Sequence, residues 1–307
     1  MNESCSPNAA PAGSSRGVAI ETGRRAVRAY GMLTARLRPL PEFVMIGAKR
    51  GGTTSFYYDL LEHRQICPLF PPPNRLPGKA RASKGTDFFD QNYFRGERWY
   101  RSYFPTYVAR RRQQRRAGGP VISGEASTYY MFHPGAPERA AATVPDTLIL
   151  AVLRDPVLRT YSHWKERRRE GREKLSFVDA LAAEDDRIGP VEDRLRSDPT
   201  FYSYAHEQQS YARQSEYDRS LERWLAHYPR RQILVLRSED YYRNPETTLR
   251  RATDFLGLEP QPIASGTIRE KAGGESIDPA VADRLAARFA GNNQRLEELT
   301  GQSFDWR

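Results

Sequence analysis

Short uninterrupted runs of apolar residues recur along this chain, and longer amphipathic segments separate them. The runs at residues 43–46, 147–153 and 233–236 have the length and composition of strands buried on both faces of a parallel sheet. Residues 66–67 suggest a shorter strand. Because helical patterns alternate with these runs, we expect an α/β fold with helices on both faces of a central parallel sheet. Ligands of such folds bind at the carboxyl ends of the strands.

Helix start signals follow two of these runs directly. Residues 53–55 are hydroxyl-bearing and open the first predicted helix. After the second run, Asp155 suits the N-cap position and Pro156 the first helical position. Gly171 is placed to end that helix. Each of the two strands is therefore predicted to lead through a short turn into a helix.

Two further segments are expected to border the binding site of a second substrate, which is called the acceptor below. Residues 68–85 form a long proline-rich loop, which is where a lid or an acceptor edge would lie. Residues 172–213 are polar and helical in places, with breaks at Pro190 and Pro199. We interpret this second segment as an insertion on the acceptor side.

The N-terminal part of the chain differs in composition from the rest. Residues 1–15 are rich in Ser, Pro, Ala and Gly and are expected to be disordered. Residues 16–38 place five arginines beside apolar positions, a pattern typical of a basic amphipathic helix that contacts a membrane surface or docks on the domain. A frayed lead-in helix is the alternative. We therefore divide the chain into a lead-in, residues 1–40, and one domain, residues 41–307.

Composition limits the class of protein. The chain has 307 residues, of which 38% are hydrophobic, enough for a large core. It contains no apolar stretch long enough to span a membrane, and its first residues have no apolar signal core. Its two cysteines, Cys5 and Cys67, do not make a disulfide framework. These features predict a cytoplasmic location.

Charge suggests an anionic ligand. The formal net charge is +10, and only six of the 48 basic residues are lysines. A basic surface favours a phosphorylated donor, an acidic acceptor, nucleic acid or an anionic membrane. The arginine clusters at residues 110–116 and 167–169 are more typical of solvated faces than of binding sites. We do not expect nucleic acid as a partner.

The turn after the first strand has the chemistry of an anion cradle. Its glycines allow a sharp turn and close approach of backbone N–H groups to a ligand. The spacing nearly matches the nucleotide-triphosphate loop, but Thr53 stands where that loop needs lysine. The cations lie inside the turn instead, at Lys49 and Arg50. The residues predicted to surround the anion are Lys49, Arg50, Gly51, Gly52, Thr53, Thr54 and Ser55.

Arg154 is placed at the carboxyl end of the second strand. Nucleotide hydrolases often have an acid there that helps to hold Mg²⁺. An arginine instead binds phosphate directly and without a metal. The chain has no His/Cys cluster with ligand spacing, so we expect no metal site.

These two motifs resemble those of sulfotransferases that use 3′-phosphoadenosine 5′-phosphosulfate, in the heparan-type and bacterial branch. That family's loop reads roughly K/R-x-G-T-T, with Arg50 on the basic position. Residues 153–164 look like its 3′-phosphate motif, in which Arg154 and Ser162 would bind that phosphate. Arg269 and Lys271 lie in a basic glycine loop where related enzymes close over the nucleotide. The resemblance covers residues 41–306 and implies a P-loop-like three-layer α/β/α fold. The implied donor becomes 3′-phosphoadenosine 5′-phosphate after transfer.

The catalytic base is less clear, because this chain departs from the family pattern. The family's K-E-x-x-F-F-D segment matches residues 84–90, but Gly85 replaces the glutamate that is the proposed base. Asp90 matches, and Asp87 would point to the side of residue 85 if the segment is extended. Glu125, in a G-E-x-S segment, is another candidate. Catalytic roles are therefore assigned to Arg50 and to one of Asp87, Glu125 and Asp90.

Other readings remain open at this point. A P-loop-like phosphotransferase would need Mg·ATP, and a degenerate family member would bind the donor without a base. A basic module for nucleic acid or membrane surfaces would not need Arg154. The acceptor would be a hydroxyl or amine of a glycan, lipid, polyketide or small phenol, and the sequence does not choose among these classes because variable loops build acceptor pockets.

Overall fold

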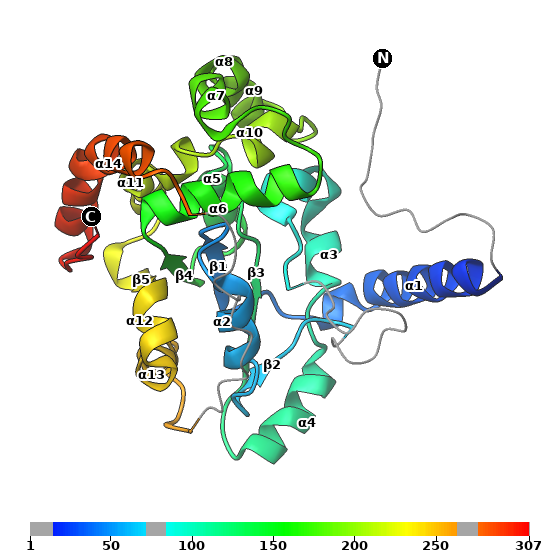
Figure 1. Ribbon diagram of the computed structural model, residues 1–307. Coiled ribbons are helices and arrows are strands. Elements are labelled where there is room, and N and C mark those ends of the chain that lie inside the picture. The colour runs from blue at the N-terminus through cyan, green and yellow to red at the C-terminus, as the bar shows by residue number, and fades with distance from the viewer. Residues whose placement is uncertain (1–14, 72–83, 263–275, 307) are drawn as a thin grey trace.

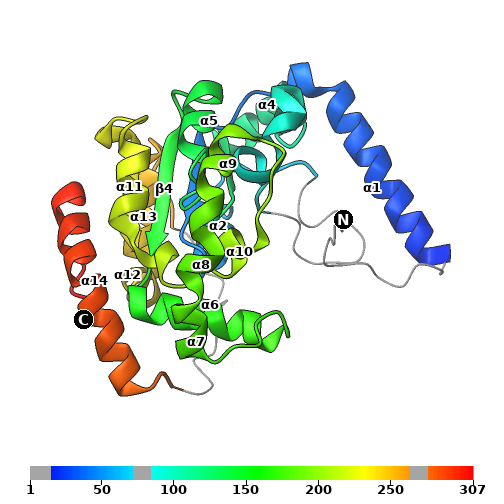
Figure 2. The ribbon, with the colours of Figure 1, turned by 90° about the horizontal axis from the view of Figure 1, so that it is seen from above.

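A computed structural model describes residues 15–71, 84–262 and 276–306 (Figure 1). The predicted ligands Arg269 and Lys271, and most of the proline-rich loop, lie outside these residues. The described part of the chain forms a central sheet with helices on both faces, which confirms the predicted fold class (Figures 1 and 2).

The sheet has five strands in the order β2-β3-β1-β4-β5, and every neighbouring pair is parallel. The predicted apolar runs form three of the strands. Helices cover both faces of the sheet, which explains why these strands read as continuous apolar segments. The strands are β1 (Phe43–Gly47), β2 (Ile66–Cys67), β3 (Ile122–Ala126), β4 (Leu148–Leu153) and β5 (Ile233–Arg237).

Helices follow and cover these strands. Asp155 caps α6 by accepting from the backbone N–H of Leu158, and Pro156 is its first residue, as predicted. The helices are α1 (Ser15–Leu33), α2 (Thr53–Leu60), α3 (Gly96–Arg101), α4 (Tyr107–Ala117), α5 (Ala136–Thr143), α6 (Pro156–Arg169), α7 (Phe177–Ala182), α8 (Glu184–Ile188), α9 (Glu192–Ser197), α10 (Tyr204–Gln208), α11 (Tyr217–Leu225), α12 (Ser238–Arg243), α13 (Pro245–Phe255) and α14 (Pro279–Thr300).

Alternate residues of each strand point into different cores. Val44 and Ile46 of β1 pack with residues of α3, α5, α11 and α14. Phe43 and Met45 point the other way and pack with α2, α12 and α13. This period of two, with both sets fully buried, produces the three-layer arrangement.

The N-terminal helix α1 extends away from the sheet (Figures 1 and 2). Two of the arginines counted for a basic surface point into the protein instead. Arg28 lies over the ring of Tyr103, 4.0 Å from its centroid, and Arg38 is buried beside Phe70. Within the described segments, no helix combines the length and apolar character needed to cross a membrane.

The predicted acceptor-side insertion, residues 172–213, folds largely as the short helices α7 to α10, close to α6 (Figure 1). Because β1 and β4 are neighbours in the sheet, the turns that follow them lie side by side. The order of the strands therefore brings the two sequence motifs to one edge of the sheet.

Candidate active site

The turn between β1 and α2 needs glycine at two positions. A Cβ at Gly51 would lie 2.9 Å from the carbonyl oxygen of Ala48 and would also collide with the carbonyl of Val152. Gly52 has a φ of +85°, a left-handed conformation that side chains disfavour. The chain thus passes close to β4 and enters α2 with the first N–H groups of the helix unpaired within it. Thr53 and Ser55 in the first turn are buried.

Arg50 joins the two sequence motifs. Its Nε donates to Oγ of Ser162 on α6 over 3.1 Å, and its Nη1 forms a 2.7 Å ion pair with Glu166. The basic residue of the first motif and the serine of the second therefore lie in direct contact.

Arg154 follows β4 and is partly exposed. Its backbone carbonyl accepts from the hydroxyl of Tyr217 over 2.9 Å, which holds the backbone in place. Its guanidinium makes no hydrogen bond or ion pair with any residue in the described ranges. The side chain therefore remains available to an anionic ligand.

Lys84 is a site residue to which sequence reasoning gave no role. Its Nζ donates to Oγ1 of Thr53 over 3.0 Å, so a cation from another loop reaches the turn that lacks the usual lysine. Burial lowers the pKa of Lys84 to about 8, with Asp87 opposing this effect and Lys49 adding to it. The signal was present in the sequence, because Lys84 begins the matched K-E-x-x-F-F-D segment.

Lys49 points away from its neighbour Arg50 and toward α10. Its Nζ lies 3.3 Å from Oε1 of Glu207 and 2.6 Å from Oε1 of Gln208. Burial lowers the pKa of Lys49, and the charge of Glu207 opposes this effect. Nothing in the local sequence indicated Glu207 as a site residue.

The three candidate bases differ in their surroundings. Glu125 is fully buried at the end of β3 and accepts hydrogen bonds from the backbone and hydroxyl of Thr86, from Ser127 and from Tyr130. Asp90 is buried, and its Oδ2 has no hydrogen-bond partner among the described atoms. Asp87 is the exposed member of the three.

The segment before Asp90 is not extended, which corrects the premise used to place Asp87. Asp87 has a φ of +49° in the left-handed region, and a single π-helical turn, Phe88–Asn92, follows it. The backbone turns here because Ser127 and Tyr130 accept or share the N–H groups of residues 86–88. Asp87 is nevertheless close enough to Lys84 and Glu125 to interact with both electrostatically.

Gly85 fits its position for a steric reason. A Cβ there would lie 2.6 Å from the carbonyl oxygen of Ala126 and would collide with Oγ of Ser127. The family's glutamate therefore has no room at this position unless the loop moves.

Burial raises the pKa values of the three carboxylates, and neighbouring negative charges add to this effect for Asp87 and Asp90. Desolvation of its carboxylate by the surrounding protein is the largest cause that raises the pKa of Asp87 to about 6. The negative charges of Glu125 and Glu207 add to this effect. Burial raises the pKa of Asp90 well above its usual range, and Asp87 adds to this effect. Burial also raises the pKa of Glu125, although its hydrogen bonds act in the opposite direction. Asp87 is thus both accessible and poised to accept a proton near neutral pH.

Within residues 15–71, 84–262 and 276–306, no group of three or more His, Cys, Asp or Glu side chains is arranged to hold a metal ion. Asp155, the acid nearest the end of β4, is engaged as the N-cap of α6. The arrangement thus presents cations and hydroxyls to an anionic ligand.

Comparison with known proteins shows similarity to sulfotransferases. A family profile described as "Sulfotransferase domain" matches residues 40–273, which is most of the chain. A solved structure of a sulfotransferase from Alicyclobacillus acidocaldarius superposes with a TM-score of 0.62 and 26% identity. That alignment covers 87% of this chain and 98% of the other.

Curated relatives include much longer proteins. A bifunctional heparan sulfate N-deacetylase/N-sulfotransferase from Drosophila melanogaster is 27% identical over 72% of this chain and 20% of its own length. The heparan sulfate glucosamine 3-O-sulfotransferase 3A1 of Mus musculus is 27% identical over 82% of this chain and 54% of its own length. The chain thus spans about half or less of these two relatives.

Proposed function

The chain belongs to the sulfotransferase domain family, and we propose that it transfers a sulfuryl group from 3′-phosphoadenosine 5′-phosphosulfate to a hydroxyl or amine of a glycan or small-molecule acceptor. The observation that carries this proposal is the contact between Arg50 and Ser162. It brings the loop suited to the 5′ end of the donor against the helix suited to its 3′-phosphate.

The residues present fit a donor with anions at both ends. The start of α2, with Thr53 and Ser55, offers N–H and hydroxyl donors to the 5′ side. Arg154 and Ser162 offer a guanidinium and a hydroxyl to the 3′-phosphate. Lys84 adds a cation beside Thr53. Bound donor would supply an activated sulfuryl group.

We place the catalytic base at Asp87. A base must reach the acceptor, and Asp87 is exposed whereas Glu125 and Asp90 are buried. Both oxygens of Glu125 are also occupied by hydrogen bonds that tie residue 86 to β3. Glu125 therefore shapes the loop in this proposal, and Asp90 supports it from within the core.

In the proposed transfer step, each proton and each bond is accounted for by the donor, the acceptor and these residues. Asp87 removes the proton from the acceptor oxygen or nitrogen as that atom forms its bond to sulfur. The bond between sulfur and the donor's bridging oxygen breaks. Arg50 and the loop N–H groups stabilise the negative charge that develops on the departing phosphate.

The phosphotransferase alternative has one observation in its favour. Lys84 brings a cation to the loop whose own sequence lacks the lysine. Against it, the position after β4 holds Arg154, and Asp155 is engaged as a helix cap. A phosphotransferase would also have no use for a 3′-phosphate site.

The names of the relatives guide the choice of acceptor. One is an N-sulfotransferase and another a glucosamine 3-O-sulfotransferase, so both amine and hydroxyl acceptors fit the family. Peripheral contact of residues 16–38 with an anionic membrane remains part of this proposal, with Arg28 and Arg38 withdrawn from the basic surface.

A transfer assay tests the proposal. The chain is incubated with ³⁵S-labelled donor and with glucosamine oligosaccharides, aminoglycosides and phenols in separate reactions, with γ-³²P-ATP and Mg²⁺ in parallel. Label moving from the sulfur donor to any acceptor, and lost in Asp87→Asn, supports the proposal. Label moving only from ATP supports the phosphotransferase. Donor binding without transfer to any acceptor indicates a degenerate member.

A further inference from the structure

The short helix α10 reaches the turn between β1 and α2, residues 48–52, through two adjacent side chains; this turn is called the donor loop below. Glu207 and Gln208 both accept from Nζ of Lys49, over 3.3 Å and 2.6 Å. The Lys49 and Glu207 side chains are only 14% and 12% exposed. An ion pair held this far from solvent is screened less than a surface pair. The position of Lys49 therefore depends on a segment 158 residues away.

The other oxygen of Glu207 faces the loop of residues 84–92, which carries the proposed base Asp87 and is called the acceptor loop below. Oε2 accepts from Nε2 of Gln91 over 3.1 Å and from the hydroxyl of Tyr202 over 2.8 Å. Gln91 is the neighbour of Asp90, in the turn that follows Asp87. One carboxylate thus contacts the donor loop through one oxygen and the acceptor loop through the other.

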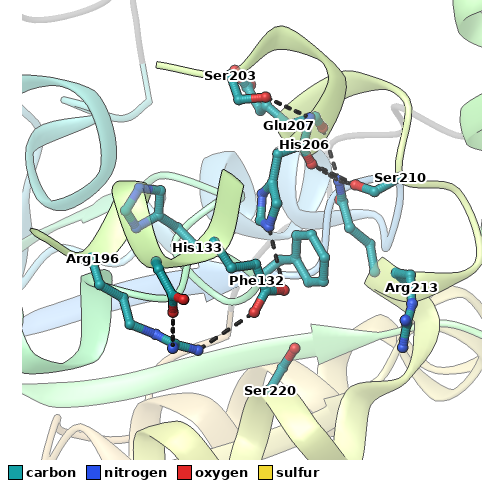
Figure 3. A network of polar contacts seen from close by, with 12 residues as sticks. Phe132, His133, Arg196, Ser203, His206, Glu207, Ser210, Arg213 and Ser220 are labelled. Atoms are coloured by element: carbon teal, nitrogen blue, oxygen red, sulfur yellow. Dashed lines mark hydrogen bonds and ion pairs between the residues drawn. The ribbon is translucent and has the colours of Figure 1, made fainter. Parts of the chain in front are cut away.

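The helix that carries Glu207 is held in place by its buried neighbour His206 and by its N-cap. Figure 3 shows Ser203, His206 and Glu207 together, with His206 pointing toward Phe132. The ring of His206 stacks on Phe132 at 4.5 Å between centroids, and its Nδ1 lies 2.6 Å from the hydroxyl of Tyr129. Ser203 caps the helix by accepting from the N–H of His206. Glu207 therefore projects from a fixed support.

We propose that Glu207 is a positioning residue that holds the Lys49 ammonium and the Gln91 amide together, so that the donor and acceptor loops are aligned for transfer. This inference rests on the proposed function. Every oxygen of Glu207 is occupied by hydrogen bonds, so the side chain acts through Lys49 and Gln91. The placed charge of Lys49 would then act on the sulfuryl end of the donor, which 3′-phosphoadenosine 5′-phosphate lacks.

A double-mutant cycle on nucleotide binding separates this role from simple structural support. Glu207→Gln, Lys49→Met and the double variant are titrated calorimetrically with 3′-phosphoadenosine 5′-phosphosulfate and with 3′-phosphoadenosine 5′-phosphate. Each single substitution is expected to weaken the binding of 3′-phosphoadenosine 5′-phosphosulfate by about fivefold more than the binding of 3′-phosphoadenosine 5′-phosphate. The double variant is expected to be no weaker than Lys49→Met, because the two residues act through one contact.

Two further variants serve as a charge-retaining rescue and as a control. Glu207→Asp keeps the charge and is expected to recover part of the loss; it also replaces Glu207→Gln if that variant does not fold. Asp193→Asn is the matched control, because it removes an acid that is 97% exposed and pairs with Arg196 in the same insertion. It should bind both nucleotides like the unmodified chain.

A second readout needs no ligand. Competitive acetylation of the lysines across a pH series, read by mass spectrometry, reports the pKa of each amine. Glu207→Gln should lower the pKa of Lys49, because the carboxylate raises it, while Glu166, Arg167 and Lys84 stay unchanged around it. The exposed Lys174 serves as the internal control.

The outcomes separate the two levels of the argument. Suppose that the unmodified chain binds both nucleotides. If each substitution then weakens the binding of both nucleotides equally, or if the two losses of affinity multiply in the double variant, the positioning role is overturned and the proposed function stands. An unchanged pKa of Lys49 in Glu207→Gln also overturns it. If the unmodified chain binds neither nucleotide, the proposed function fails and the positioning role fails with it.

Discussion

Arg50 in the turn after β1 donates to Ser162 on α6 over 3.1 Å, although the two residues are 112 positions apart. The contact exists because β1 and β4 are neighbours in the sheet and each leads directly into a helix. A loop suited to one phosphate is thereby fixed against a helix suited to another. The same arginine forms an ion pair with Glu166, so an anionic donor must compete with Glu166 for Arg50.

Glu166→Gln is expected to strengthen the binding of 3′-phosphoadenosine 5′-phosphate by about twofold to fivefold, because it removes a partly exposed carboxylate that competes for Arg50. Calorimetric titration measures the change. Glu170→Gln is the control, since Glu170 is more exposed and pairs with Arg167, the second partner of Glu166, rather than with Arg50. Weaker binding by Glu166→Gln would show that the carboxylate orients Arg50 rather than competing for it.

Asp87→Asn is expected to lower turnover by about 10²- to 10⁴-fold, the usual contribution of a general base, with little change in donor binding. In the unmodified enzyme, the rate should rise with pH through about 6, because Asp87 accepts a proton only when it is ionised. The pH–rate profile with an acceptor from the transfer assay measures both effects. A profile in Asp87→Asn that still rises near pH 6, at an unchanged rate, would move the base elsewhere.

Lys84→Met is expected to weaken the binding of 3′-phosphoadenosine 5′-phosphate by about tenfold, the scale of a charge-assisted hydrogen bond. A depressed lysine pKa means that the charge is lost as pH rises through the folded value. Affinity in the unmodified chain should therefore fall above a pH of about 8. Lys84→Met should lose this fall, whereas a persisting fall would assign it to another group.

Gly85→Glu is expected to destabilise the fold by ~1–3 kcal/mol, the usual cost of overpacking, because Ala126 and Ser127 fill the space where its Cβ would lie. Urea unfolding measures the loss. Gly291→Ala is the control, since a Cβ on that helical glycine meets nothing within 4 Å and should be neutral or stabilising. A Gly85→Glu variant as stable as the unmodified chain would mean that the loop moves readily.

Much of the fold could be predicted because its signals are local. Asp155 stands before a proline and caps a helix, as predicted from residue type, and Asn244 caps α13 in the same way. Buried strands were recognisable because β1 and β4 lie inside the sheet and are apolar on both faces. The family motifs likewise pointed to Arg50 and Ser162, which lie in contact, and to Arg154 as a further predicted ligand.

The remaining site features depend on contacts between distant segments. Lys84 reaches Thr53 from another loop, and Lys49 reaches Glu207 across 158 residues, so neither pairing has a local pattern. The left-handed backbone of Asp87 follows from hydrogen bonds to Ser127, which periodicity does not encode. Sequence reasoning therefore singled out two motifs that the structure brings into contact, but it did not predict the geometry around the proposed base.

The most direct test of the account is a calorimetric titration with 3′-phosphoadenosine 5′-phosphate in the presence of a chelator, on the unmodified chain and on Arg154→Ala. Adenosine 5′-phosphate and Mg·ATP serve as comparison ligands. We predict metal-independent binding that weakens by about 10- to 100-fold in Arg154→Ala, because a charge-assisted contact to the 3′-phosphate is lost. Absence of binding, a preference for Mg·ATP, or an Arg154→Ala variant that binds as tightly as the unmodified chain would contradict it.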